Sequence, residues 1–510
     1  MLFSNRDDRV HLAFWLGLLA VMLARTFFFG FSYFLYLDDY NTYGIFFRRN
    51  ENIWQDIILF YGHYTWRPLA FFADAYITQW FFPRLEWVLL FYTFLHFFVV
   101  VLFYDILKKC ELNFGALGIL LISLSPILFE SVYWIGASTR LLPAMFLSLL
   151  AVYFMIKKKY VLFGILSVLQ SGFYEQMVVF HLVFSCAIIL IMNKNRKLML
   201  IPFGASIFMA LYYFIFDFLV DGRAAGRMQF IEISNILTHP LRVILAAFNT
   251  MLRTNFLINF HGIISGFMLL TTFITIFISV LVVIYSVFVF SNLKKESLSL
   301  EEFYDNPLTK LLLGVVLTIA PLAPFFVLQG IWLPPRTIFA SIFGLSILVD
   351  TVFSLFPKTF KAITSALLIV PFFLVYIAEV NNFRLIEQTD TIIINNFLNT
   401  FEGDEDDFIV LLNTNYIISN VTFEGNHRLE NISSSNWALL GGLNSTSREH
   451  TFTNVMPVQN GSEIPDWDEI VFLGMDEYLN IFNLQLINNT FYADGEVFGT
   501  LEENIFMLSY

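Results

Sequence analysis

Residues 12–36 read LAFWLGLLAVMLARTFFFGFSYFLY, and the next seven residues read LDDYNTY. The first stretch is apolar apart from Arg25, and it is long enough to cross a bilayer, which takes about 20 apolar residues. The carboxylates Asp38 and Asp39 stand directly at its exit. We therefore predict a membrane span over 12–35 that ends in an acidic pair at the membrane surface.

The composition of the whole chain is typical of a helical membrane protein. Of 510 residues, 57% are hydrophobic, 18% are aromatic and only 14% are charged, whereas a soluble domain carries about 25% charged residues. Apolar blocks of about 20 residues alternate with short polar segments, so we predict an all-α polytopic membrane protein with about eleven spans. The predicted spans are 12–35, 87–107, 114–131, 139–156, 160–173, 175–192, 198–219, 263–290, 311–329, 338–356 and 361–379.

Clusters of Lys and Arg predict the orientation, because loops rich in these residues stay in the cytoplasm. The clusters lie at 108–109, 157–159, 194–197, 294–295 and 358–361. All of them fall on one side if the N-terminus is cytoplasmic. The loops 36–86 and 220–262 and everything after about residue 380 then lie outside, and we expect the membrane to be a bacterial inner membrane rather than the endoplasmic reticulum.

The predicted membrane part contains one unusually short pair of spans and a first span that resembles a signal sequence in position. The residues between Lys159 and Asn193 are few for two full crossings, so we expect a hairpin of broken or tilted helices that turns at Gly172. No small-residue cleavage site follows the first span, which indicates an anchor rather than a cleavable signal.

The composition changes near residue 380, which predicts a membrane domain over 1–380 and an extracytoplasmic domain over 381–510. The second part contains 20 Asp or Glu, three Arg and no Lys, so its net charge is −17, whereas the net charge of the whole chain is −12. This acidity argues against nucleic acid as a partner. It contains strand-like runs, and Asp494-Gly495 is a hairpin signal, so we predict a small α/β or β-rich fold. The runs lie at 408–412, 415–423, 469–474 and 491–501.

The outer loop 36–86 contains two amphipathic stretches, at about 50–61 and 68–82, in which aromatic and polar residues alternate. Such helices lie along the membrane interface. Arg67 stands between them, directly before a proline that favours a helix start. An arginine at that place suits a phosphate group, since it offers forked donors, although it also fits an interfacial arginine that only reaches toward water.

Four further charged residues stand at the predicted outer face. Glu130 and Arg140 bracket a Trp-Ile-Gly turn before the fourth span, and Arg336 begins the tenth. Glu175 is the most anomalous, because apolar sequence lies on both sides of it, and intramembrane acids are usually paired or functional. We weigh a functional role for Glu175 against a structural ion pair, for example with Arg140 or Arg67.

These residues lie in motifs that resemble the GT-C glycosyltransferase superfamily of membrane enzymes. The Asp38-Asp39 pair in a long first outer loop resembles its acidic motif. Residues 64–69 (YTWRPL) resemble the Tyr-Arg-Pro-Leu element of the branch that includes protein O-mannosyltransferases. Residues 134–142 (WIGASTRLL) resemble the Gly-Arg-x-x-Leu element of that branch, and residues 174–176 resemble its Lys-Glu turn, with Tyr in place of Lys.

The resemblance covers roughly residues 10–200 and implies glycosyl transfer from a polyprenyl-phosphate sugar, with inversion, to a glycan, lipid or protein acceptor. It implies Asp39 or Asp38 as the general base, and we place Asp39 first. Arginines would neutralise the leaving phosphate, and further side chains would orient them or touch the sugar. The predicted phosphate ligands are Arg67, Arg140 and Arg336. The predicted orienting or substrate residues are Glu175, Glu130, Tyr64 and His63.

The sequence leaves the cofactor and three other classes of protein open. No motif with metal-ligand spacing is present, although His63 and His181 would permit a divalent metal. A secondary transporter or flippase of lipid-linked sugars would also have many spans and buried charges, but it usually shows internal repeats. A large extracytoplasmic loop in the middle of the chain would indicate a polysaccharide polymerase or ligase, but the loop 220–262 is only modest in length. A receptor-like protein would leave the acids and arginines unexplained.

Overall fold

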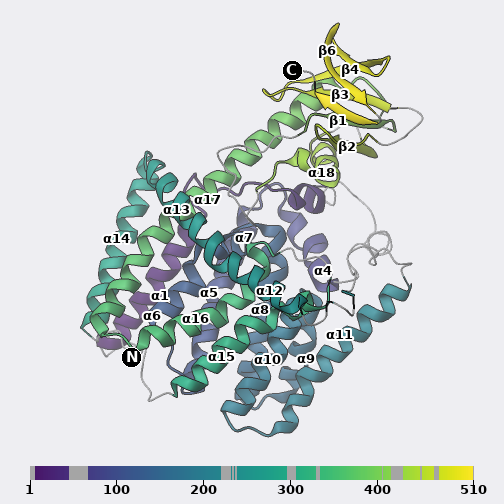
Figure 1. Cartoon of the computed structure of the whole chain (residues 1–510). Helices are drawn as coiled ribbons and strands as arrows, with labels where there is room; N and C mark the ends of the chain where they lie inside the picture. Colours follow the sequence, from purple (N-terminus) through teal and green to yellow (C-terminus); the bar gives the residue numbers. More distant parts are fainter. Residues whose placement is uncertain are drawn as a thin grey trace.

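The structure is a computed structural model of the chain. It describes residues 6–44, 67–219, 231–232, 235, 238–295, 306–328, 333–404, 406–414, 429–447, 451–464, 470–502 and 504–508. The described residues form a helical body that carries a C-terminal domain built on a seven-stranded sheet (Figure 1).

Within the described residues, eight helical segments are long and apolar enough to cross a membrane. They include α5 (Glu86–Lys109), α8 (Ile135–Ile156), α14 (Phe273–Lys294) and α17 (Lys358–Thr400). The other four are continuous runs of shorter helices, at Ala116–Tyr133, His239–Met268, Pro307–Phe326 and Pro335–Ser354. The membrane-like, mostly helical character is confirmed, whereas the total of eleven spans stays a prediction.

The remaining elements of the body complete this arrangement. The shorter or flanking helices are α1 (Arg6–Ala24), α4 (Pro68–Tyr76), α9 (Tyr160–Leu169), α10 (Glu175–Ile191) and α11 (Leu200–Leu219). The runs named above contain α6 (Ala116–Leu124), α7 (Phe129–Tyr133), α12 (His239–Asn249), α13 (Asn255–Met268), α15 (Pro307–Ile319) and α16 (Phe339–Ser354).

Burial separates helices that are enclosed by protein from helices that present an apolar surface outward. Helices α13 and α14 pack on α17, α15 packs on α16, and α5 packs on α8 (Figure 1). The segment Ala116–Tyr133 is 94% buried over its most apolar window, whereas Phe273–Lys294 is only 22% buried. An apolar helix with that much outward surface requires an apolar surrounding, which a bilayer provides.

The first predicted span is shorter as a helix than the sequence indicates. Helix α1 ends at Ala24, and the chain then turns and runs extended over 32–36, although the apolar sequence continues. The next residue, Arg25, is 3% exposed and donates hydrogen bonds from Nε and Nη2 to Thr93 Oγ1 at 3.1 and 2.7 Å. Gly30 has a φ of +90°, which glycine adopts without strain.

Three other predicted regions can be compared with the structure. The hairpin expected around Gly172 is present, as two short apolar helices over Tyr160–Gly172 and Glu175–Ile191. The predicted loop 220–262 is helical from His239 onward. Periodicity alone missed this helix because it is the least hydropathic of the eight candidates. The predicted span 263–290 is wrong as one helix, because α13 ends at Met268 and α14 begins at Phe273.

The C-terminal domain has its seven strands in the order β2-β1-β3-β4-β5-β6-β7. The strands are β1 (Phe408–Leu412), β2 (Asn454–Val458), β3 (Ile470–Met475), β4 (Ile481–Ile487), β5 (Thr490–Ala493), β6 (Glu496–Glu502) and β7 (Ile505–Leu508). The predicted run 408–412 is confirmed as β1, and 470–474 of the run 469–474 lies in β3. The run 491–501 forms the hairpin of β5 and β6, whereas 415–423 and residue 469 lie outside the described residues. Asp494 and Gly495 both have positive φ, which is the backbone that a two-residue hairpin turn requires.

Helix α17 runs through residue 380 without interruption, and the C-terminal domain packs back onto the loop that carries the acidic pair. Helix α18 (Asn436–Thr446) lies on the turn η1 (Tyr40–Gly44), so closely that a Cβ at Gly441 would stand 2.6 Å from Asn41 Cα. Ile432 N donates to Asp390 Oδ1 of α17 at 2.7 Å.

Candidate carboxylate and arginine site

Asp39 is a fully buried carboxylate that holds the chain around it. Its Oδ2 accepts hydrogen bonds from Tyr33 OH at 2.5 Å and from Tyr36 N at 3.0 Å, and its Oδ1 accepts from Gly136 N at 3.2 Å. Burial raises the pKa of Asp39 to about 8, although these donors favour the charged form. Asp39 therefore ties the first loop to the start of α8.

Asp38 is the accessible member of the pair. Its side chain is 28% exposed, and its Oδ2 lies 3.7 Å from Arg140 Nη1, in an ion pair without short contact. Its Cβ lies near Gly136, where an added Cβ would be 3.4 Å away. The sequence placed Asp39 first as the base, and burial favours Asp38 instead, because a base must reach the proton that it removes.

A third carboxylate, Asp74, completes this side of the site. It lies on α4, is completely buried, and accepts a hydrogen bond from Tyr43 OH at 3.0 Å. Burial raises the pKa of Asp74 to about 6, and the charge of Arg140 opposes that rise. The sequence analysis missed Asp74, whose only signal was an acid within the aromatic stretch 68–82.

Arg67 and Glu175 form a forked ion pair. Arg67 Nε donates to Glu175 Oε2 at 2.8 Å, and Nη2 donates to Oε1 at 2.5 Å, while the guanidinium lies 4.5 Å from the centre of the Tyr174 ring. Arg67 directly precedes α4, which begins with a proline, and Glu175 begins α10. The structural ion pair weighed for Glu175 is therefore present, with Arg67 as the partner.

Arg336 and Glu130 form the second close pair. Arg336 Nη1 donates to Glu130 Oε1, and the guanidinium lies 5.0 Å from the centre of the Trp134 ring. Glu130 is buried on α7, and Arg336 stands on the short turn η9 (Pro335–Ile338) that leads into α16. The stacked indole and the carboxylate hold the guanidinium in one orientation.

The Arg67 guanidinium lies over the ring of Tyr174, and the charges of all three arginines act on this phenol. Burial raises the pKa of its phenol, and the charges of Arg67, Arg336 and Arg140 all oppose that rise. The structure thus brings together residues that lie on α4, α8, α10 and η9 and that are up to 269 positions apart in the chain, from Arg67 to Arg336. The predicted residues His63 and Tyr64 lie outside the described residues.

Three of the five carboxylates of the site form ion pairs with the three arginines. Arg67 and Arg336 have their carboxylates at hydrogen-bonding distance, whereas the Arg140–Asp38 pair is the most open of the three. At the third pair, a partly exposed carboxylate and a guanidinium therefore lie side by side.

The described residues contain no group of three or more His, Cys, Asp or Glu that could hold a metal ion. The buried His181 lies in a hydroxyl network, in which its ring nitrogens share hydrogen bonds with Ser148 at 3.0 Å and Ser167 at 2.8 Å. This network accounts for a buried histidine without any ligand.

No protein-family model matches the chain, and no curated protein or solved structure matches it either. The resemblance to GT-C glycosyltransferases therefore stays a prediction from the quoted motifs.

Proposed function

We propose that this chain is an integral-membrane glycosyltransferase that moves a sugar from a polyprenyl-phosphate donor to an acceptor hydroxyl, with inversion at the anomeric carbon. The observation that carries the proposal is the Asp38–Arg140 pair, which places an accessible carboxylate 3.7 Å from a guanidinium. Such a pair offers a base for the acceptor and a cation for the leaving phosphate at one place.

The positions of charges along the helices support an eleven-span membrane protein with this site on the outer face. Arg140 lies in the second turn of α8, and Lys157 to Lys159 follow the other end of the same helix. Glu175 likewise begins α10, and Lys194 follows its end. The basic ends face the cytoplasm by the positive-inside rule, which leaves the carboxylates and arginines on the opposite face.

The reaction assigns one role to each side chain. Asp38 accepts the proton of the acceptor hydroxyl as the new O–C1 bond forms. The C1–O bond to the phosphate breaks at the same time, and the lipid phosphate leaves with the electron pair. Arg140 neutralises the charge that develops on this phosphate. The negative leaving group needs no proton, which is why one accessible carboxylate suffices.

In this proposal, the two hydrogen-bonded ion pairs, Arg67–Glu175 and Arg336–Glu130, hold side chains in position and take no part in the reaction. Glu175 orients the fork of Arg67 over the Tyr174 ring, and Glu130 orients Arg336 over the Trp134 ring. Asp39 holds the loop through Tyr36 N and joins it to α8 through Gly136 N. A site held by such supports keeps its reacting groups in place as the substrate changes.

The test is transfer from a panel of radiolabelled polyprenyl-phosphate sugars in membranes with matched amounts of wild type, Asp38→Asn and Arg140→Gln. We expect Asp38→Asn to lower turnover about 10²- to 10⁴-fold, which is the usual contribution of a general base. Asp105→Asn, at the far end of α5, serves as the control. Turnover by Asp38→Asn at the wild-type rate would refute the role of Asp38.

A second outcome would replace the whole proposal. If wild type consumes none of the donors, but the purified chain carries lipid-linked sugars across a vesicle bilayer, the flippase class applies instead.

A further inference from the structure

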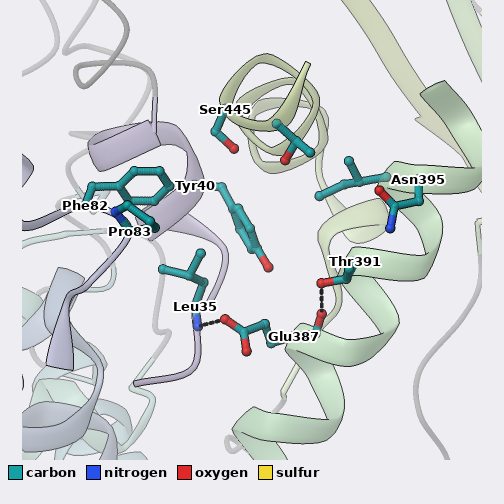
Figure 2. A pocket seen from close by; sticks show the side chains of 10 residues that line it. Leu35, Tyr40, Phe82, Pro83, Glu387, Thr391, Asn395 and Ser445 are labelled. Atoms are coloured by element: carbon teal, nitrogen blue, oxygen red, sulfur yellow. Dashed lines mark hydrogen bonds between the residues drawn. The ribbon is translucent and has the colours of Figure 1, made fainter. Parts of the chain in front are cut away.

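A cavity of about 400 Å³ lies where the first loop, α17 and α18 meet. Its apolar walls include Leu35, Phe82 and Ile394, and its polar groups come from five other residues together with the phenol of Tyr40. Figure 2 shows the Tyr40 ring between Phe82-Pro83 and α17, with its hydroxyl directed toward the helix. The volume is in the range of roughly 300–1,000 Å³ that small-molecule sites occupy.

The polar wall is a stripe on one face of α17. Glu387, Thr391 and Asn395 follow one another at intervals of four residues, which places them on the same side of the helix (Figure 2). Ser445 and Thr446 of α18 lie on the opposite wall. Hydroxyl, amide and carboxylate groups therefore surround the cavity from two sides.

These groups retain hydrogen-bonding capacity toward a ligand. Glu387 Oε1 accepts from Leu35 N at 2.9 Å, and Thr391 donates to Glu387 O at 2.8 Å, which leaves Glu387 Oε2 and the oxygen of Thr391 as acceptors. Within the part of the chain that the structure describes, neither the Asn395 amide nor the Tyr40 hydroxyl has a hydrogen-bond partner. Donors and acceptors thus alternate around the space.

The charge of the wall restricts the ligand. Among the described residues that line the cavity, Glu387 is the one ionisable carboxylate, and none is a cation. A carboxylate without a neighbouring cation repels anions and accepts hydrogen bonds from neutral hydroxyls. Aromatic and aliphatic walls with alternating polar groups match the C–H faces and hydroxyl edges of a sugar ring.

We propose that this cavity binds a neutral saccharide unit, and that this unit belongs to the acceptor of the glycosyl transfer. The acceptor role rests on the proposed function, whereas saccharide binding does not. The segment Leu35–Tyr40 links the two places, because it contributes both ends to the cavity wall and carries Asp38 between them. The acceptor would be a glycan or the sugar headgroup of a lipid.

The experiment measures saccharide binding to the full chain in lipid nanodiscs by saturation-transfer NMR and calorimetry. Nanodiscs are required because maltoside detergents present the same sugar chemistry. The probes are cellobiose and methyl glucoside, with methyl glucuronide as the acidic counterpart of the latter. The variants are Thr391→Val and Asn395→Ala, and Gln388→Ala, an exposed position of α17 outside the cavity wall, is the matched control.

We expect the neutral sugars to bind, the glucuronide to bind at least tenfold more weakly, and each cavity variant to weaken binding about fivefold, as the loss of one hydrogen bond predicts. Gln388→Ala should match wild type. Nanodiscs doped with a glucosyl lipid separate the two sources, since displacement of methyl glucoside by the lipid identifies a lipid acceptor and its absence identifies a soluble glycan.

Two results would overturn the proposal: absence of binding by every neutral sugar, or binding that the cavity variants leave unchanged. Donor turnover measured on the same preparations keeps the two proposals apart. Turnover without saccharide binding would refute the cavity assignment alone. Saccharide binding without turnover would refute the transferase and leave the cavity as a sugar site.

Discussion

Arg67 and Glu175, which are 108 positions apart, meet through two parallel hydrogen bonds of 2.8 and 2.5 Å. This pair joins the start of α4 to the start of α10, and Leu69 packs against Gly172 in the same contact, where an added Cβ would be only 2.8 Å from the leucine side chain. The start of α4 is thus fixed to the turn between α9 and α10 by one polar and one apolar contact.

Glu175→Gln should lower donor turnover about tenfold to hundredfold, because a charged hydrogen bond contributes about 1.5–3 kcal/mol and Arg67 would lose its orientation. The matched control is Asp105→Asn. The Lys109–Asp105 pair has side-chain exposures of 27% and 35%, which match the 26% and 34% of Arg67–Glu175. It lies at the C-terminal end of α5, outside the proposed site. Equal initial rates for the two variants at matched protein levels would contradict the positioning role.

Stability should depend on pH through Asp39. Its pKa is raised to about 8 in the folded chain, and an unfolded aspartate has a pKa of about 3.9. Between these values the folded state keeps a proton that the unfolded state has released, so the free energy of unfolding falls as the pH rises. Melting temperatures of wild type and Asp39→Asn at pH 5, 6, 7 and 8 should therefore diverge, with only wild type losing this contribution. Parallel curves would show that Asp39 is already charged when folded.

Lys310→Met should destabilise the protein by about 3–5 kcal/mol, because it leaves a buried carboxylate without its cation. Lys310 and Asp350 are 3% and 4% exposed, their charged atoms lie 3.5 Å apart, and Asp350 also accepts a hydrogen bond from Gly115 N at 3.1 Å. Unfolding in sodium dodecyl sulfate measures the loss. The double variant with Asp350→Asn should recover most of it, since asparagine still accepts from Gly115, and an equally large loss in the double variant would argue against this reasoning.

Gly441→Ala should lower the melting temperature, although alanine is ordinarily the better helix former by about 0.5–1 kcal/mol. The new methyl group would meet the backbone of Asn41 at 2.6 Å and force α18 off η1, at a cost of about 1–3 kcal/mol. Gly204→Ala on α11 is the control, because nothing lies within 4 Å of its Cβ position, and it should be neutral or stabilising. A rise in melting temperature for both variants would mean that α18 does not pack as described.

Local patterns predicted the parts of this structure that local energetics determine. The apolar blocks at α5, α8 and α14, the short hairpin at Gly172 and the Asp494-Gly495 turn follow from hydropathy and turn chemistry, which neighbouring residues decide. Helix α1 ends early where Arg25 donates a hydrogen bond to Thr93 of another helix. The sequence around Arg25 does not reveal that distant partner.

The residues of the site could be selected from sequence, but their partners could not. Arginines and acids next to aromatic residues at span ends marked residues that form ion pairs with one another, and one of the two partners suggested for Glu175 is present. Whether Asp38 or Asp39 is accessible depends on how η1 and α8 pack, and the pairing of Glu130 with Arg336 spans 206 positions. Such choices are made by tertiary packing, which a single sequence does not display.

With the proposed topology, the length of α17 sets the height of the proposed saccharide cavity above the membrane. Its 43 residues from Lys358 to Thr400 extend about 64 Å, which is twice the roughly 30 Å of the hydrocarbon core. With Lys358 at the cytoplasmic surface, about 20 residues cross the lipid, and Glu387 then stands about 13 Å beyond its outer edge. If the chain transfers a sugar as we propose, the length of α17 sets how far from the membrane an acceptor must reach. Shortening the helix by one turn would draw the cavity about 5 Å toward the lipid.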